Sequence, residues 1–149
     1  MSFKKEVKQH KTVESKDYTF WSDFKNTLDE QIDNEETHKI EEILRGLNLL
    51  LEKEDFRYWG ANKLSMIYGK GFGVEKNIEK SIEYMEIAAN EGSFSAKINI
   101  GKLYLGGSPF REKNLEKALA IFKEVNEYYL YKGEYEATIQ IIKTEMGIE

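Results

Sequence analysis

Three glycines in five residues, within the stretch YGKGFGV that begins at Tyr68, form the first pattern that could do chemistry. Glycine-rich loops can hold phosphate groups, because their backbone N–H groups approach an anion without a side chain in the way. The spacing here is neither G-x-G-x-x-G nor G-x-x-x-x-G-K followed by serine or threonine. The preceding segment ANKLSMIY has the apolar spacing of a helix, whereas both motifs follow a strand. We therefore predict that these glycines turn the chain between two helices.

His38, Glu41 and Glu42 form a second candidate group, because spacings of three and four residues place side chains on one face of a helix. Imidazole and carboxylate groups can bind zinc, but there is no H-E-x-x-H motif and no second histidine nearby. We interpret this group as a solvated helix surface. The serines lie in no nucleophile motif and no acid/base pair of carboxylates stands out. The sequence therefore predicts no enzyme, no metal site and no cofactor.

The composition excludes other kinds of site. The chain has 149 residues, which fits one domain, and it has no cysteine for a disulfide, a thiolate metal site or a cysteine nucleophile. Hydrophobic residues make up 40% and charged residues 33%, values typical of a soluble protein with a core. The first residues lack the apolar segment of a secretory signal, and no apolar run is long enough to span a membrane. We expect a cytoplasmic protein.

The net charge of −5 is unevenly distributed. Residues 1–16 carry five lysines and two glutamates, a charge of +3, whereas Asp29–Arg57 carries ten acids and four bases, a charge of −6. An acidic body repels phosphates, so we expect no binding to nucleic acid. The acidic segment could instead favour a basic protein partner.

Helical periodicity extends over most of the chain and predicts seven helices. Their apolar residues fall within 18–32, 40–51, 56–68, 78–89, 96–104, 115–125 and 135–146. Asn77 and Asn114 are predicted N-caps, and Gly92 is a predicted left-handed stop. Residues 1–16 are polar and poorly periodic, and we expect a basic tail that stays disordered until something binds it.

A helix–turn–helix unit occurs twice in the sequence. Pairs of similar residues 36 positions apart are Leu64 with Ile100, Ile67 with Leu103, Tyr68 with Tyr104, and Gly71 with Gly107. After one extra residue in the second loop, pairs 37 positions apart are Asn77 with Asn114, Lys80 with Lys117, and Ile82 with Leu119. Such a unit needs its neighbours to bury a core, so a stack of helix pairs is expected.

The recurring residues resemble the Sel-one-like repeat family, an α-solenoid relative of the tetratricopeptide repeats. They are Leu64, Ile67, Tyr68, Gly71, Gly73, Val74, Asn77, Tyr84, Ala88, Ala89 and Gly92. Gly60, Ser65 and Ser81 depart from the family pattern, standing where alanine, glycine and alanine are usual. The second unit keeps the first half of the pattern but has Val125 and Asn126 in place of two alanines.

The resemblance implies an all-α fold, a short right-handed α-solenoid of about seven antiparallel helices. Residues 60–92 and 96–129 would be the two repeats, and the flanking helices would be caps. Residues 17–149 would then form a single domain.

Three surfaces could bind a partner. Tyr128, Tyr129, Tyr131 and Tyr135 form an aromatic cluster, in which Tyr128 and Tyr135 are expected to pack inward, leaving Tyr129 and Tyr131 exposed. The first helix of each pair is expected to line a concave face with Asn62, Lys63, Met66, Lys70, Lys97, Asn99 and Lys102. The acidic candidates for electrostatic binding are Glu35, Glu36, Glu41 and Glu42.

The family resemblance implies a non-enzymatic protein-binding module, either monomeric or weakly dimeric. A narrower hypothesis is a dedicated inhibitor, such as an immunity protein that blocks a basic toxin domain. The alternative is a regulatory adaptor or scaffold in signalling or envelope assembly, and a remote alternative is a small enzyme with an unrecognised carboxylate site. No nucleic acid or membrane partner is expected.

Overall fold

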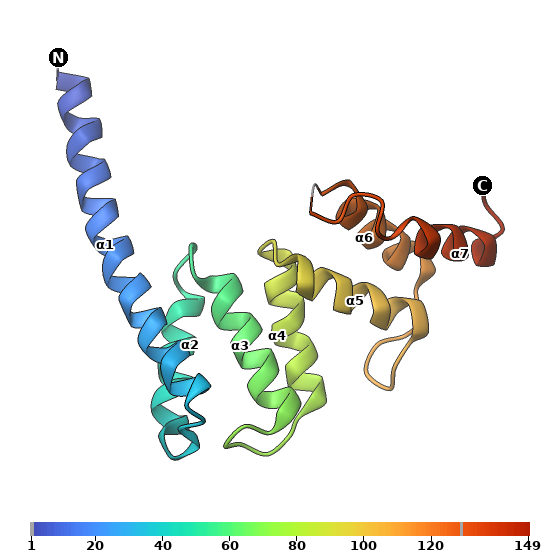
Figure 1. Ribbon diagram of the computed structural model, residues 1–149, viewed down its shortest axis with the longest axis horizontal. Coiled ribbons are helices and arrows are strands. Elements are labelled where there is room, and N and C mark those ends of the chain that lie inside the picture. Colours follow the sequence, from blue (N-terminus) through green and yellow to red (C-terminus); the bar gives the residue numbers. More distant parts are fainter. Residues whose placement is uncertain (1, 129) are drawn as a thin grey trace. The chain divides into compact units, whose positions relative to one another are not determined.

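The computed structural model describes residues 2–128 and 130–149, with side chains from Lys16 onward (Figure 1). The elements are α1 Ser2–Asp33, the short 3₁₀ helix η1 Thr37–Lys39, α2 Ile40–Leu51, α3 Arg57–Lys70, α4 Ile78–Asn90, α5 Phe94–Gly106, α6 Leu115–Glu127 and α7 Glu136–Met146. The described residues contain no strand, and their one isolated β-bridge joins Ser108 and Arg111. The predicted all-α fold class is confirmed.

The chain forms two compact units, residues 1–57 and 58–149. The expectation of one domain over residues 17–149 stays a prediction, since each unit is defined by itself. Helix α1 begins at Ser2, within the segment expected to be a disordered tail. Met1 and the side chains of residues 2–15 lie outside the described part, so the disorder of the tail also stays a prediction.

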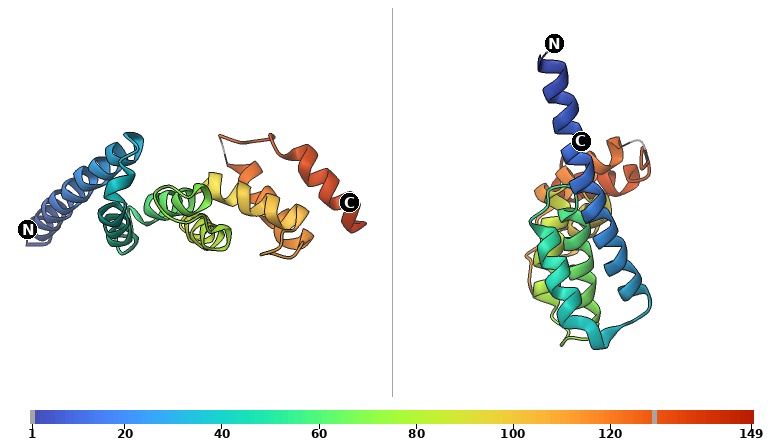
Figure 2. Two further views of the ribbon diagram at one scale, coloured as in Figure 1. Left: turned by 90° about the horizontal axis from the view of Figure 1, so that it is seen from below. Right: turned by 90° about the vertical axis from the view of Figure 1, so that its left-hand side faces the viewer.

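In the first unit, α1 and α2 pack against each other as an antiparallel pair (Figure 2). Leu28 is buried where the two helices approach most closely, because a Cβ atom at Gly46 would lie 2.7 Å from Leu28 Cδ2. Phe56, which follows α2, is buried beside Tyr18, with ring centroids 5.2 Å apart. Burial of each large apolar side chain stabilises the pair by roughly 1.5–3 kcal/mol.

In the second unit, successive helices pack against one another from α3 to α7 (Figures 1 and 2). Helix α5 contacts α4 and α6, and α7 closes the series by packing on α6. One core cluster joins α6 to α7, and its buried members are Ala118, Leu119, Phe122, Ile139 and Ile142. This arrangement buries an apolar face of each helix against its neighbours, as the helical periodicity predicted.

The loops that join α3 to α4 and α5 to α6 end in the same way. Asn77 Oδ1 accepts a hydrogen bond from the Lys80 backbone N–H at 3.0 Å, and Asn114 Oδ1 accepts one from Lys117 at 2.9 Å. Each asparagine has extended backbone angles just before its helix. Both predicted N-caps are therefore confirmed, and each supplies an acceptor for an N–H group that has no partner within the helix.

The glycine-rich stretch is a turn that follows a helix. Gly71 and Gly107 both have φ of +72°, and each donates its backbone N–H to a carbonyl four residues earlier, that of Ile67 or Leu103. This conformation is unfavourable for residues that carry a Cβ atom. Gly71 follows helix α3 and Gly107 follows helix α5, so each glycine lies in a turn after a helix and not after a strand, as the sequence predicted for the first.

Within each repeat the two helices approach closely at small residues. Ser65 on α3 and Ser81 on α4 are buried, and each hydroxyl donates to the other residue's carbonyl oxygen, at 2.8 and 2.7 Å. The equivalent residues on α5 and α6 are Gly101 and Ala118, both buried. A Cβ atom at Gly101 would lie only 3.0 Å from the Phe122 ring. The two repeats therefore achieve the same close packing with different side chains.

We predict that Gly71→Ala and Gly107→Ala each lower the free energy of unfolding by about 1–2 kcal/mol, because a Cβ atom disfavours this left-handed conformation. Steric contact adds to the cost, since the new Cβ would lie 3.2 Å from the Val74 carbonyl oxygen or from the Lys113 nitrogen. Urea denaturation followed by circular dichroism measures the change.

Gly106→Ala is the matched control for Gly107→Ala. Gly106 is the last residue of α5, and a Cβ atom there would have no neighbour within 4 Å. This substitution should be neutral or stabilise the protein by up to about 1 kcal/mol, because alanine favours the helix. Equal effects at Gly106 and Gly107 would contradict the proposed role of the turn glycine.

Candidate partner-binding surfaces

An aromatic surface forms where the α4–α5 loop approaches the end of α6 and the loop that follows it. We define this aromatic surface as Tyr58, Phe94, Tyr128, Leu130 and Tyr131. The Phe94 and Tyr128 rings stack with centroids 4.1 Å apart at 13°, and the Tyr131 ring lies 6.2 Å from each of them. Tyr58 and Leu130 are 44% and 62% exposed. The result is a supported group of rings beside two side chains that are open to solvent.

A pocket of about 420 Å³ is lined by the aromatic surface together with polar residues. Ser93 lies at its base as the N-cap of α5, accepting a hydrogen bond from the Ala96 backbone N–H at 3.3 Å. Asn62 Nδ2 donates to Ser93 Oγ at 3.0 Å, which links α3 to the start of α5. The side chains of Asn62 and Ser93 are thus bonded to each other, whereas Tyr58 and Leu130 are exposed to a partner.

The tyrosine cluster expected from the sequence divides in the structure. Tyr135 packs on the Phe122 ring at 5.4 Å, and burial raises the pKa of its hydroxyl. Tyr128 and Tyr131 are half-buried within the aromatic surface, and Tyr129 lies outside the described residues. Phe94 was missed because it is the first residue of α5, 34 positions before Tyr128. Tyr58 and Leu130 were missed because nothing local to them indicates that they line the same pocket.

The expected concave face on α3 contains residues that already have contacts. Lys63 Nζ lies 5.5 Å from the centroid of the Trp59 ring. Asn62 takes part in the bond to Ser93, Met66 is half-buried and Lys70 is exposed. These side chains support the stack as well as facing solvent, and their role in binding stays a prediction.

The three α5 residues expected on that same face are not together. Asn99 and Lys102 are exposed, whereas Lys97 is half-buried, forms an ion pair with Glu124 and lies 5.0 Å from the centroid of the Phe94 ring. Lys97 also lines a groove with residues of α4 and α6. A helical step of about 100° per residue places Asn99 and Lys102 roughly 160° and 140° away from Lys97. The grouping from sequence is therefore corrected for Lys97.

We call the groove around Lys97 the polar groove. It encloses about 410 Å³ and is lined by Glu86, Ala89, Asn90, Lys97, Ile100, Tyr104, Ile121 and Glu124. Its floor is largely apolar, and two ion pairs lie at its edges, Lys97 with Glu124 and Arg111 with Glu86. The hydrogen bond to Glu86 raises the pKa of Arg111 above its ordinary value. Arg111 and Lys97 are therefore charges that already have partners.

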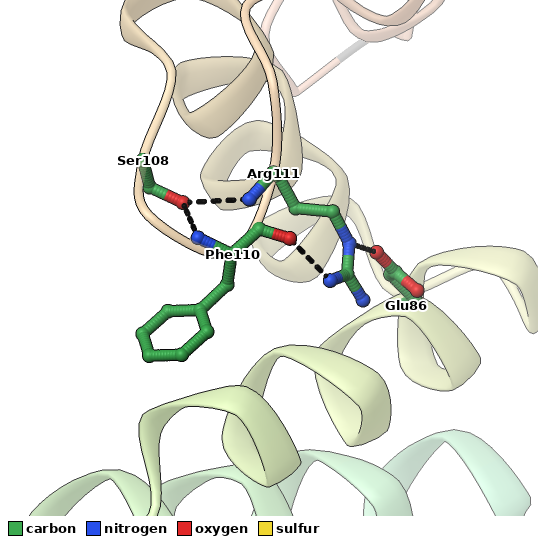
Figure 3. Close-up of polar contacts among 4 residues, drawn as sticks. All are labelled: Glu86, Ser108, Phe110 and Arg111. Carbon is green, nitrogen blue, oxygen red and sulfur yellow. Dashed lines mark hydrogen bonds and ion pairs between the residues drawn. The ribbon is translucent and has the colours of Figure 1, made fainter.

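The loop from Gly107 to Asn114 carries an exposed aromatic ring, that of Phe110 (Figure 3). Ser108 Oγ accepts hydrogen bonds from the backbone N–H groups of Phe110 and Arg111, at 3.2 and 3.1 Å. Arg111 Nη1 donates to the Phe110 carbonyl at 2.7 Å, and its Nε donates to Glu86. One guanidinium group thus ties the loop to α4. Phe110 is 41% exposed.

The acidic candidates lie in the first unit. Glu41 and Glu42 are exposed in the first turn of α2, where negative charge is favourable. Glu36 pairs with Lys39 at 3.2 Å, and Glu35 is exposed with φ of +53°. His38 is exposed beside them, and among the described residues no group of three or more histidine, aspartate or glutamate side chains could hold a metal ion. The role of these carboxylates in binding stays a prediction.

Lysines held over tyrosine rings recur in the two repeats. Lys80 Nζ lies 4.4 Å from the centroid of the Tyr68 ring, and Lys117 Nζ lies 5.1 Å from that of Tyr104. A hydrogen bond to Tyr68 raises the pKa of Lys80, and Tyr68 stacks on Tyr84 at 5.8 Å. A raised pKa keeps the lysine charged, which suits packing against a ring and is the opposite of what a basic catalyst needs.

Comparison with known proteins identifies the repeat. The model of the Sel1 repeat family matches residues 60–93 and 95–124. HRD3B of Arabidopsis thaliana, described as an ERAD-associated E3 ubiquitin-protein ligase component, is 45% identical over 56 residues. That match covers 34% of this chain and 9% of the relative. None of the described helices has the length and apolar character that a membrane span requires. The helix pairs α3–α4 and α5–α6 of this chain are two Sel1 repeats.

Proposed function

We propose that this chain is a non-enzymatic module that binds another protein. Sel1 repeats generally mediate interactions between proteins. The observation that carries the proposal is the aromatic surface, in which the stacked rings of Phe94 and Tyr128 line one pocket with the exposed side chains of Tyr58 and Leu130. Aromatic side chains are favoured anchors at interfaces because they bring a large contact area with few rotatable bonds.

The binding site we propose is the aromatic surface and its pocket. A pocket of about 420 Å³ accommodates one or two partner side chains. The stacked rings of Phe94 and Tyr128 are ordered before binding, so little conformational entropy is lost when the partner arrives. Tyr58 and Leu130 would lie across the rim and lose their exposed area to the partner.

A narrower proposal is a dedicated inhibitor that blocks a basic protein, such as an immunity protein for a toxin domain in the cytoplasm. It is supported by the charge of −6 over Asp29–Arg57 and by the exposure of Glu41 and Glu42. Carboxylates on an exposed face accelerate association with a basic partner, and this effect weakens as salt is added.

The second candidate function is an adaptor in a larger assembly. The similarity to HRD3B supports it, because that relative is described as a component of a ubiquitin ligase. An adaptor needs two surfaces for two partners, whereas an inhibitor needs one. A single partner at 1:1 stoichiometry, bound by a monomer, would favour the inhibitor.

We predict that Leu130→Asp together with Tyr58→Ala weakens partner binding at least tenfold, because the partner would lose two anchors and meet a desolvated charge. The partner is first identified by cross-linking in the native cell and purified. Its dissociation constant is then measured by calorimetry. Ile141→Asp is the matched control, because Ile141 on α7 is 63% exposed and lies outside the aromatic surface.

Equal affinity for the wild type and the double variant would exclude the aromatic surface as the binding site. Absence of any stoichiometric protein partner in the native cell would contradict the proposed function itself. Circular dichroism and thermal unfolding establish that each variant is folded.

We predict that Glu41→Lys with Glu42→Lys slows association at least tenfold at low salt and reduces its salt dependence, if the partner is basic. Stopped-flow fluorescence measures the rate at several salt concentrations. The control is Glu112→Lys with Glu116→Lys, which makes the same charge change at two exposed residues of the second unit. An unchanged association rate for the Glu41→Lys/Glu42→Lys variant would contradict the proposal of an electrostatic inhibitor and favour the adaptor.

A further inference from the structure

The loop that carries Phe110 is one residue longer than the equivalent loop of the first repeat, which also joins two helices. The equivalent loop of the first repeat runs from Gly71 to Asn77, and that of the second from Gly107 to Asn114, one residue more. Both loops close with the same hydrogen bond, from the capping asparagine N–H to a tyrosine carbonyl, at 2.9 and 2.8 Å. The extra residue is therefore not needed for the helix pair.

The extra length changes what the loop presents to solvent. The first loop has Phe72 half-buried, with its N–H donating to the Ile67 carbonyl at 2.9 Å. The second loop has Phe110 at 41% exposure, with the ring projecting from the turn away from the Arg111 guanidinium (Figure 3). The first loop thus has its aromatic side chain half-buried, whereas the second loop has an exposed one at a position that is not equivalent in the repeat.

The turn around Phe110 is held in place before any partner arrives. The Ser108 backbone N–H donates to the Arg111 carbonyl at 2.7 Å, which closes a four-residue turn with Pro109 at its second position. Serine and proline favour these positions, because the hydroxyl bonds to backbone N–H groups and the ring fixes φ. Arg111 adds bonds to the Phe110 carbonyl and to Glu86 on α4. A rigid exposed ring is a low-entropy anchor for binding.

The surface beside the turn is acidic. Glu79, Glu83, Glu86 and Asn90 repeat every three or four residues, so they form one stripe along α4. Glu79 and Glu83 are exposed, and Glu79 is near enough to raise the pKa of Arg111. Glu86 and Asn90 also line the polar groove.

The cations around the stripe and the groove are already engaged. Glu124 and the stripe supply four carboxylates, and the four cations are Lys80, Lys97, Arg111 and Lys117. Lys80 lies over the Tyr68 ring. Lys97 and Arg111 are already in ion pairs, and Lys117 lies over the Tyr104 ring. The positive charges are thus engaged by this chain, while Glu79 and Glu83 face solvent.

We propose that the Phe110 turn, the acidic stripe of α4 and the polar groove form a second docking site, for a basic segment of a partner protein that carries an apolar residue. The apolar residue packs on the Phe110 ring or on the groove floor of Ala89, Ile100 and Ile121. A lysine or arginine beside it pairs with Glu79 or Glu83. This site is separate from the aromatic surface of the proposed function and shares no lining residue with it.

The test uses a displayed library of random 12-residue peptides, selected on the full-length chain. We expect the enriched peptides to combine lysine or arginine with a large apolar residue. A synthetic copy should bind Phe110→Ala and Glu79→Lys/Glu83→Lys at least tenfold more weakly than the wild type, by fluorescence anisotropy. Leu130→Asp, on the aromatic surface, is the control and should bind as the wild type does.

Arg111→Lys separates the role of the rigid turn from the role of charge. Lysine keeps the positive charge but has no second nitrogen to hold the Phe110 carbonyl. We expect the ¹⁵N heteronuclear NOE of the Phe110 amide to fall and the affinity to drop several-fold. Peptide-induced shifts in the wild type should fall on Glu83, Glu86 and residues 108–111.

Enrichment of acidic or uncharged peptides, enrichment of none, or unchanged affinity in Phe110→Ala would each overturn the second docking site. If the selected peptides lose affinity only for Leu130→Asp, the second site is wrong while the proposed function stands. Thermal unfolding of Phe110→Ala shows that its loss of affinity is not loss of fold, since the ring is exposed and outside the core.

Discussion

The close approach of the two helices within each repeat is the contact on which the second unit depends. In the first repeat this contact is made by Ser65 and Ser81, whose hydroxyls each donate to the other residue's carbonyl oxygen. A hydroxyl buried without a partner would cost stability, and the reciprocal bonds remove that cost. In the second repeat the equivalent positions hold Gly101 and Ala118, which are buried and carry no polar side chain, and Gly101 faces the Phe122 ring. Both repeats have small residues at these positions. A serine there must also have its buried hydroxyl hydrogen-bonded, and the reciprocal bonds supply that.

The packing of the two helices is shared by both repeats, whereas the loops that join the helices differ. The two interhelical turns share their glycine conformation, their asparagine cap and their closing hydrogen bond. The second turn has gained one residue and an exposed phenylalanine without disturbing these shared features. The aromatic surface combines the start of α3, the start of α5 and the segment after α6. The helices therefore position both candidate binding surfaces, and the loops add exposed side chains to them.

Most of the fold could be predicted because its signals are local. Asn77 and Asn114 precede apolar residues at helical spacing, and α2 and α4 begin and end close to the residues that the pattern indicated. The start of α1 was not predicted, because the sequence before Tyr18 lacks a clear apolar face. The serine pair was noticed only as a departure from the family pattern. Its reciprocal bonds join residues 16 positions apart on two helices, which no local pattern reveals.

The candidate site was less predictable, because it brings together residues from distant parts of the chain. Phe94 stacks on Tyr128, and Arg111 pairs with Glu86, 25 positions earlier. The tyrosine-rich segment was noticed, but its contact with Phe94 and the nearby Tyr58 and Leu130 were not. Lys97 was grouped with Asn99 and Lys102 although it lies on the opposite side of α5, because solvent-facing residues were grouped without their angular positions. These residues can be recognised as one surface only when the packing of the helices is known.

The most direct measurement of the central contact is a double-mutant cycle at Ser65 and Ser81. Alanine at either position alone removes one donor and should lower the free energy of unfolding by about 1 kcal/mol. The two Oγ atoms also lie 3.1 Å apart, within hydrogen-bond distance, and either single substitution removes that shared bond. The double variant should therefore lose less than the sum of the two, by at least about 0.5 kcal/mol. Additive losses, or no loss in either single variant, would contradict the account of two helices held together by this pair.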